Sequence, residues 1–98
     1  MIIKKLENEG RILSLEETKN IKAGLVVLKL GQEVGQHITT KREEVILILS
    51  GEAEIICDNI NHHLTVEQLA YIEPEKEHNV RNIGQQELKY IYLVSLFK

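Results

Sequence analysis

The sequence predicts an all-β protein, an antiparallel sandwich or barrel built from one domain of 98 residues. Short runs rich in β-branched residues recur every roughly eight to twelve residues, which is typical of such folds. Clusters of Gly, Asn, Asp and Ser separate these runs and indicate turns. The chain has one proline and no Ser/Gly-rich linker, so we expect no domain boundary inside 1–98.

The expected strands follow one another along the whole chain. The first is weak, and the pattern strengthens from Ala23 onward. Asp58-Asn59-Ile60-Asn61 predicts a tight hairpin turn, because Asx residues tolerate left-handed backbone. A short helix over 65–69 is the alternative for that segment. In chain order, we expect strands over 11–15, 25–30, 36–39, 44–49, 53–57, 62–66, 70–72, 78–82 and 88–97.

Two of these strands are apolar on both faces, at 45–49 and 90–94. A strand of a small antiparallel barrel usually presents one face to the interior and the other to water. A second apolar face must therefore be buried by something else, and a second copy of the chain could bury it in a homodimer. We expect a homodimer. The alternative is a two-layer sandwich that buries both faces within one chain.

Composition excludes several classes of partner. The net charge of −3 and the scattered basic residues argue against binding to nucleic acid or to an anionic membrane. Cys57 is the only cysteine, so the chain forms no internal disulfide and no Cys-based zinc site. No apolar run approaches the roughly 20 residues of a membrane span, and the N-terminus becomes charged too early for a secretory signal. We expect a cytoplasmic protein.

The best chemical lead is a trio of side chains, His37, Glu44 and His78. Imidazole and carboxylate groups are ligands that divalent metals use in proteins. Side chains alternate between the two faces of a strand, so Glu44 shares a face with Ile46, and His78 shares one with Val80. All three candidate ligands can therefore point into the barrel together.

The segment from Gly31 to Gly51 resembles the first motif of the cupin family. That motif reads Gly, five residues, His, one residue, His, three or four residues, Glu, six residues, Gly, and this chain matches it except that Thr39 replaces the second His. The second motif is weaker, because only His78 and Asn82 stand in register with it. The resemblance covers about residues 25–94.

The resemblance implies a small jelly-roll barrel whose metal ligands are His37, Glu44 and His78. Two imidazoles and one carboxylate form the set associated with non-haem Fe(II), and Fe, Mn, Ni or Zn would each be compatible. Thr39 would lie beside the ligands and could hydrogen-bond a water on the metal. By its place in the motif, Asn82 would satisfy backbone groups near a strand end.

Three functions remain open from the sequence. The chain is a metal-dependent enzyme for a small molecule, a non-catalytic module that binds a small ligand, or a degenerate, metal-free cupin. In the last case Ile46, Ile48 and Ile55 would narrow the cavity. Tyr71 could supply a hydroxyl to the pocket, although packing in the core or an interface is the simpler role. The three glutamates within 73–77 would disfavour anionic substrates if they rim the barrel, or they form a solvated loop.

Overall fold

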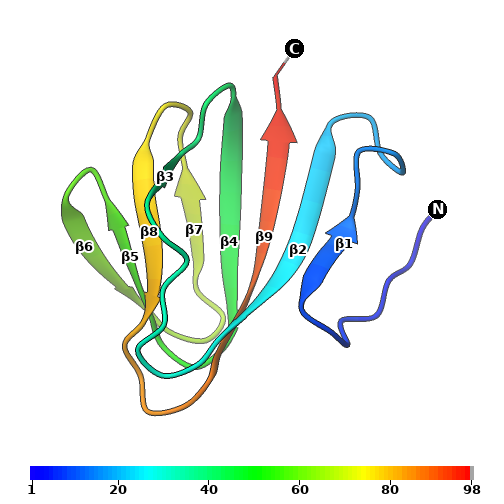
Figure 1. The fold of residues 1–98 in the computed structure, drawn as a ribbon. Helices are drawn as coiled ribbons and strands as arrows, with labels where there is room; N and C mark the ends of the chain where they lie inside the picture. The colour runs from blue at the N-terminus through cyan, green and yellow to red at the C-terminus, as the bar shows by residue number, and fades with distance from the viewer. Residues whose placement is uncertain (98) are drawn as a thin grey trace.

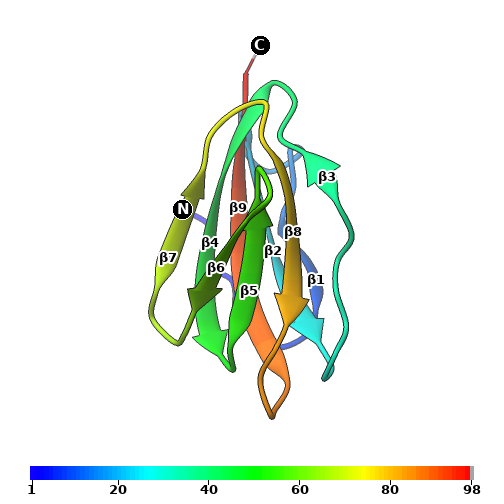
Figure 2. The same cartoon turned by 90° about the vertical axis from the view of Figure 1, so that its left-hand side faces the viewer.

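Two antiparallel sheets lie face to face and make an all-β jelly roll (Figures 1 and 2). The structure is a computed structural model that describes residues 1–97. The five-stranded sheet has the order β1-β2-β9-β4-β7, and its strands are β1 (Gly10–Leu13), β2 (Ile21–Leu28), β9 (Leu88–Leu96), β4 (Arg42–Ser50) and β7 (Leu69–Ile72). The four-stranded sheet has the order β3-β8-β5-β6, and its strands are β3 (His37–Ile38), β8 (Glu77–Asn82), β5 (Ala53–Cys57) and β6 (Ile60–Leu64).

Each expected strand is present, with bounds that differ by a few residues. The turn between β5 and β6 is a two-residue loop in which Asp58 and Asn59 have φ values of 50° and 64°. Left-handed backbone at both positions matches the right-handed twist of the flanking strands, so the hairpin closes tightly. The helix considered for 65–69 is absent. Residues 66 and 67 form a turn there, with Glu67 at φ 69°, and β7 begins at Leu69.

The hydrophobic core lies between the inner faces of the two sheets. Ile46 and Ile48 of β4 are 0% and 1% exposed, and they belong to the same buried group as Val80 of β8. Burial of each such side chain contributes about 1.5–3 kcal/mol. The other buried members of this core are Leu28, Ala53, Ile55, Leu64, Ile72, Leu88 and Tyr90.

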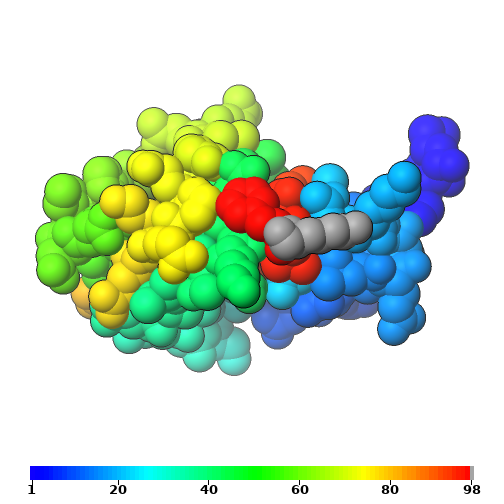
Figure 3. Space-filling view, turned by 90° about the horizontal axis from the view of Figure 1, so that it is seen from above, coloured from blue at the N-terminus to red at the C-terminus, as the bar shows by residue number. Residues whose placement is uncertain are grey.

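The outer face of the five-stranded sheet is apolar and only partly covered within residues 1–97. Ala23 and Leu25 of β2, which pair with Leu93 and Ile91 on this face, are buried, but the face is more open over β9, β4 and β7. Leu93 of β9 lies opposite Val45 of β4 and is 38% exposed, and Tyr71 of β7 is 54% exposed. One chain therefore does not bury both faces of β4 and β9. Figure 3 shows the first residues of the chain projecting from the body beyond this sheet. In residues 1–97, no helix is long and apolar enough to cross a membrane.

Candidate functional site

The structure brings His37, Glu44 and His78 together. One ligand atom from each lies within 4.8 Å of the other two. His37 on β3 is directly opposite His78 on β8, and their ring centroids are 4.0 Å apart at an interplanar angle of 60°. Directly opposed residues of an antiparallel pair have Cβ atoms about 4.5–5.5 Å apart, so the strand register alone makes the imidazoles neighbours.

Glu44 reaches the two imidazoles from the opposite sheet. It lies on β4, where alternation places its side chain on the inner face with Ile46. Its Oε1 is 3.5 Å from Nε2 of His78. The three groups thus span the gap between the two layers of the fold, and they lie at the end of the core rather than in its middle.

Each imidazole has its Nδ1 near a backbone carbonyl oxygen. Nδ1 of His37 is 3.0 Å from the Gly35 carbonyl oxygen, and Nδ1 of His78 is 3.4 Å from that of Lys76. A nitrogen that faces a carbonyl oxygen carries the proton, so Nε2 of each neutral ring keeps its lone pair.

His78 is 1% exposed, and its Nε2 has no hydrogen-bond partner among residues 1–97. Although Glu44 is close, the contact does not have hydrogen-bond geometry. An unpaired buried polar atom costs about 1–3 kcal/mol, and a cation between these groups would remove that cost. The donor set therefore fits a divalent metal, because imidazole nitrogen suits Zn, Cu, Fe and Ni, and carboxylate oxygen completes the site.

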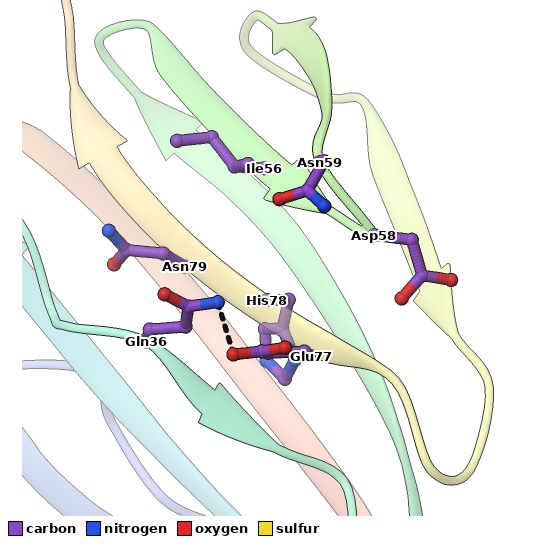
Figure 4. A pocket seen from close by; sticks show the side chains of 7 residues that line it. All are labelled: Gln36, Ile56, Asp58, Asn59, Glu77, His78 and Asn79. Atoms are coloured by element: carbon purple, nitrogen blue, oxygen red, sulfur yellow. Dashed lines mark hydrogen bonds between the residues drawn. The ribbon is translucent and has the colours of Figure 1, made fainter.

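The segment that carries His37 is tied to the outer side of β8. Asn79 accepts a hydrogen bond from the Gly35 backbone N–H at 2.8 Å, and Gln36 donates one to Glu77. Figure 4 shows these side chains on the outer surface of β8, with the ring of His78 passing behind the strand. These bonds compensate for the shortness of β3, which has two residues.

Thr39 is fully buried, and its hydroxyl is already engaged with backbone groups. The hydroxyl donates to the Glu73 carbonyl at 2.6 Å and accepts from the Lys76 N–H at 3.0 Å. Because its proton points to Glu73, any bond from Thr39 to a water on a metal would use the hydroxyl oxygen as acceptor. The side chain links the strand of His37 to the loop that precedes His78.

Asn82 and Tyr71 lie apart from the three ligands. Asn82 is at the far end of β8, where its amide donates to the carbonyls of Leu28 and Gln86 at 3.0 and 2.9 Å and accepts from the Gly84 N–H. Tyr71 is on the outer face of β7, and its hydroxyl donates to Glu43 at 2.7 Å. That bond is the largest of the causes that raise the pKa of the Tyr71 phenol.

A cavity of about 200 Å³ adjoins the ligands and includes two cations that the sequence did not single out, Lys22 and Arg42. Burial first, and then repulsion from Arg42 and Arg11, lower the pKa of the Lys22 ammonium. The ring of Tyr92 also lines this cavity and lies against Gly24, where an added Cβ would be 2.4 Å from Cε2 of the ring. The absence of a side chain at residue 24 thus lets the Tyr92 ring pack directly against the backbone of β2.

Known proteins resemble this chain in sequence and in fold. The family described as "Cupin domain" matches residues 24–94. A curated relative, "Polyketide synthase CurC" from Streptomyces cyaneus, is 25% identical over 72 residues, which are 74% of this chain and 47% of that protein. This chain thus spans about half the length of that relative.

Solved structures agree with the fold. A predicted oxalate decarboxylase from Thermotoga maritima superimposes with a TM-score of 0.85 at 20% identity, covering 89% of this chain and 77% of the other. A cupin protein from Bacteroides fragilis gives a TM-score of 0.82 at 16% identity, covering 97% and 83%. The family match extends over most of the strands and over all three clustered ligands, and this chain belongs to the cupin family.

Proposed function

We propose that this cupin holds a divalent transition-metal ion through His37, Glu44 and His78, and that the ion and the adjoining cavity together bind a small molecule. The observation that carries this proposal is the buried, unpartnered Nε2 of His78, which faces a carboxylate and a second imidazole. Two imidazoles and one carboxylate leave coordination positions open. A metal with open positions supplies Lewis acidity to a bound oxygen ligand.

The residues of the chain have separate roles in this proposal. His37 and His78 present neutral nitrogen donors, because their Nδ1 atoms are committed to backbone carbonyls. Glu44 supplies the negative charge that a divalent ion requires. Thr39 fixes the spacing between the two histidine-bearing segments through its bonds to Glu73 and Lys76.

A metal-free module with a filled interior is the competing function. Two observations weigh against it: Ile46 and Ile48 occupy the core while a cavity remains beside the ligands, and a filled interior would leave Nε2 of His78 unsatisfied. Whether the bound molecule is converted is a separate matter. The names of similar proteins differ in chemistry, and fold analogy does not choose a reaction.

The test is a metal titration with matched variants. Protein stripped with chelator is titrated with Zn(II), Mn(II), Ni(II) and, without oxygen, Fe(II), and binding is followed by calorimetry and elemental analysis. We expect one equivalent of metal in the wild type. Glu44→Gln and His37→Ala should weaken binding by more than the roughly 10–100-fold that loss of an outer hydrogen-bond partner costs.

The chain offers close controls. Glu43→Gln changes the neighbouring carboxylate, which bonds Tyr71 on the outer face, and His63→Ala changes an exposed histidine that pairs with Glu52. Both should bind metal as the wild type does. A wild type that takes up none of the four metals, or controls that lose as much affinity as the ligand variants, would refute the proposed centre.

A further inference from the structure

The cavity beside the metal ligands carries an excess of positive charge. Among its lining residues the charged side chains are Lys22, Arg42 and Glu44. The other lining residues are His37, Thr39 and apolar or tyrosine side chains. In the proposed function, the negative charge of Glu44 is offset by the metal ion that it binds. Two cations then face the cavity with no anion of their own.

The sheet register explains why these cations lie beside Glu44. Lys22 of β2 and Glu44 of β4 are both opposite Val94 of β9, so they form one row across the inner face. Two strand spacings separate their Cα atoms, about 10 Å, a gap that a lysine stem can largely cross. Arg42 precedes Glu44 by two residues on the same strand and face, with its Cα about 7 Å away.

Neither cation is neutralised within residues 1–97. No side-chain carboxylate of the described residues lies within ion-pair distance of Lys22 or Arg42. Among the same residues, the Arg42 side chain makes one hydrogen bond, from Nε to the Thr40 carbonyl at 3.3 Å, and its terminal nitrogens make none. Burial is the largest cause that lowers the pKa of Lys22, and repulsion from Arg42 and Arg11 lowers it further in spite of the attraction of Glu44. Unpaired, partly buried cations are costly unless a ligand supplies the counter-charge.

The acidic loop does not oppose this field. Glu75 accepts a hydrogen bond from the Lys41 backbone N–H, and Glu77 bonds Gln36 on the outer side of β8. Glu73 lines a different cavity, next to β6 and β7. None of these three glutamates lines this cavity, so they do not repel an anion from it as they would if they surrounded the barrel mouth.

We infer that the ligand of this site is a small carboxylate, whose charged group binds Lys22 and Arg42 beside the three metal-ligating side chains. The planar guanidinium of Arg42 matches the two oxygens of a carboxylate, and Lys22 adds a point charge. The cavity is smaller than the roughly 300–1,000 Å³ of sites for drug-sized ligands, so the acid has few carbon atoms. Val34, Val80 and Val94 provide an apolar wall for its chain.

This inference rests on the proposed function for the role of the metal, but the anion site itself is measurable without metal. The experiment titrates metal-free protein and zinc-loaded protein with butyrate, with its neutral analogue butyramide and with inorganic phosphate, at constant ionic strength. Backbone amide shifts in β2 and β4, recorded by two-dimensional NMR, report binding. We expect butyrate to bind at least about ten times more tightly than butyramide, since a hydrogen bond to a charged group is worth about tenfold or more.

Variants then identify the groups that bind the acid. Lys22→Gln and Arg42→Gln should each weaken butyrate binding about tenfold, Arg42→Lys should weaken it less, and Lys29→Gln, at an exposed lysine, should change nothing. Arg42→Lys keeps the charge, so it still tests the inference if a neutral variant fails to fold. Butyrate affinity in the wild type should also fall as ionic strength rises.

The outcomes separate this inference from the proposed function. Equal affinity for butyrate and butyramide, unchanged affinity in Lys22→Gln and Arg42→Gln, or tighter binding of phosphate than of butyrate would overturn the carboxylate site. Zinc binding without butyrate binding in either form refutes this inference alone. Butyrate binding that depends on Lys22 and Arg42, in a protein that takes no metal, refutes the metal centre alone.

Discussion

Replacement of Glu44 by glutamine should change stability in opposite directions with and without metal. Glu44 is 8% exposed, and within residues 1–97 its carboxylate accepts no hydrogen bond, so in the metal-free protein it is a buried charge with a poor partner. Glu44→Gln keeps the size and removes the charge. We expect the metal-free variant to be as stable as the wild type, or more stable by up to about 1 kcal/mol.

The metal reverses this order because it binds the folded state. At a free concentration 100 times its dissociation constant, an ion stabilises the wild type by about 2.7 kcal/mol. For 98 residues, with an unfolding entropy of about 2.1 cal/mol/K per residue, this raises the melting temperature by about 13 °C. A variant that binds 100-fold more weakly would gain about 0.4 kcal/mol under the same conditions.

The assay is thermal unfolding followed by circular dichroism, in chelator and again with saturating zinc. Glu43→Gln serves as the control, since it removes a carboxylate charge on the exposed outer face, where the amide oxygen can still accept the hydrogen bond from the Tyr71 hydroxyl. That control should show the same shift with zinc as the wild type. A Glu44→Gln protein that zinc stabilises fully, or that loses more than about 2 kcal/mol without metal, would show that Glu44 is a structural residue.

Three further predictions concern other parts of the fold. Gly24→Ala should destabilise the protein by about 1–3 kcal/mol, measured in urea, because the new methyl group would overlap the ring of Tyr92; an unchanged midpoint would contradict that contact. The sequence predicts a homodimer. If the apolar outer sheet face is its interface, Leu93→Glu should give a folded monomer in analytical ultracentrifugation, and an unchanged dimer dissociation constant would place the interface elsewhere. Cys57 should react with iodoacetamide at pH 8 more slowly than a free thiol, because burial, and then Asp58, raise its pKa. Denaturant should restore the rate, and equal rates in the folded and the denatured protein would contradict this prediction.

The trio of candidate ligands could be predicted because alternation along a strand is strict. Once His37, Glu44 and His78 were placed in strands, the period of two decided which neighbours share their faces. The hairpin turn at Asp58 and Asn59 could be predicted for a similar local reason, since few residues tolerate left-handed backbone. Short-range geometry determined the turn and the face of each candidate ligand, whereas the meeting of the three side chains also depends on the pairing of β3 with β8 and on the packing of the two sheets.

The cationic side of the cavity could not be predicted in the same way. The expected strand began at residue 25, whereas β2 begins at Ile21, so Lys22 had no face assigned to it. Arg42 fell between the strands expected over 36–39 and 44–49, whereas β4 begins at that residue. Strand ends depend on pairing with partners distant in sequence, and here Lys22 pairs with Val94.

Register across sheets also decided the position of Tyr71. The sequence shows that Tyr71 and Ile72 point to opposite faces, but it does not show which face is inside. Pairing of β7 with β4 sets Ile72 beside Glu44 and Tyr71 beside Val45, which turns the tyrosine outward. The helix considered for 65–69 is absent for a related reason. Backbone hydrogen bonds join residues 67 and 68 to Ile48 of β4, and this long-range pairing outweighs the weak local helical pattern.

Thr39 gives this protein a property that a third histidine at the site would not. By resemblance to the family motif, its position is where another imidazole would stand, yet here the side chain bridges the backbones of Glu73 and Lys76. The scaffold around the two remaining imidazoles is thereby held by neutral bonds and does not depend on an ion for its shape. We expect that an ion held at the proposed centre can be exchanged for another without rearrangement of the backbone around His37 and His78, so that the metal content depends on which cations are available.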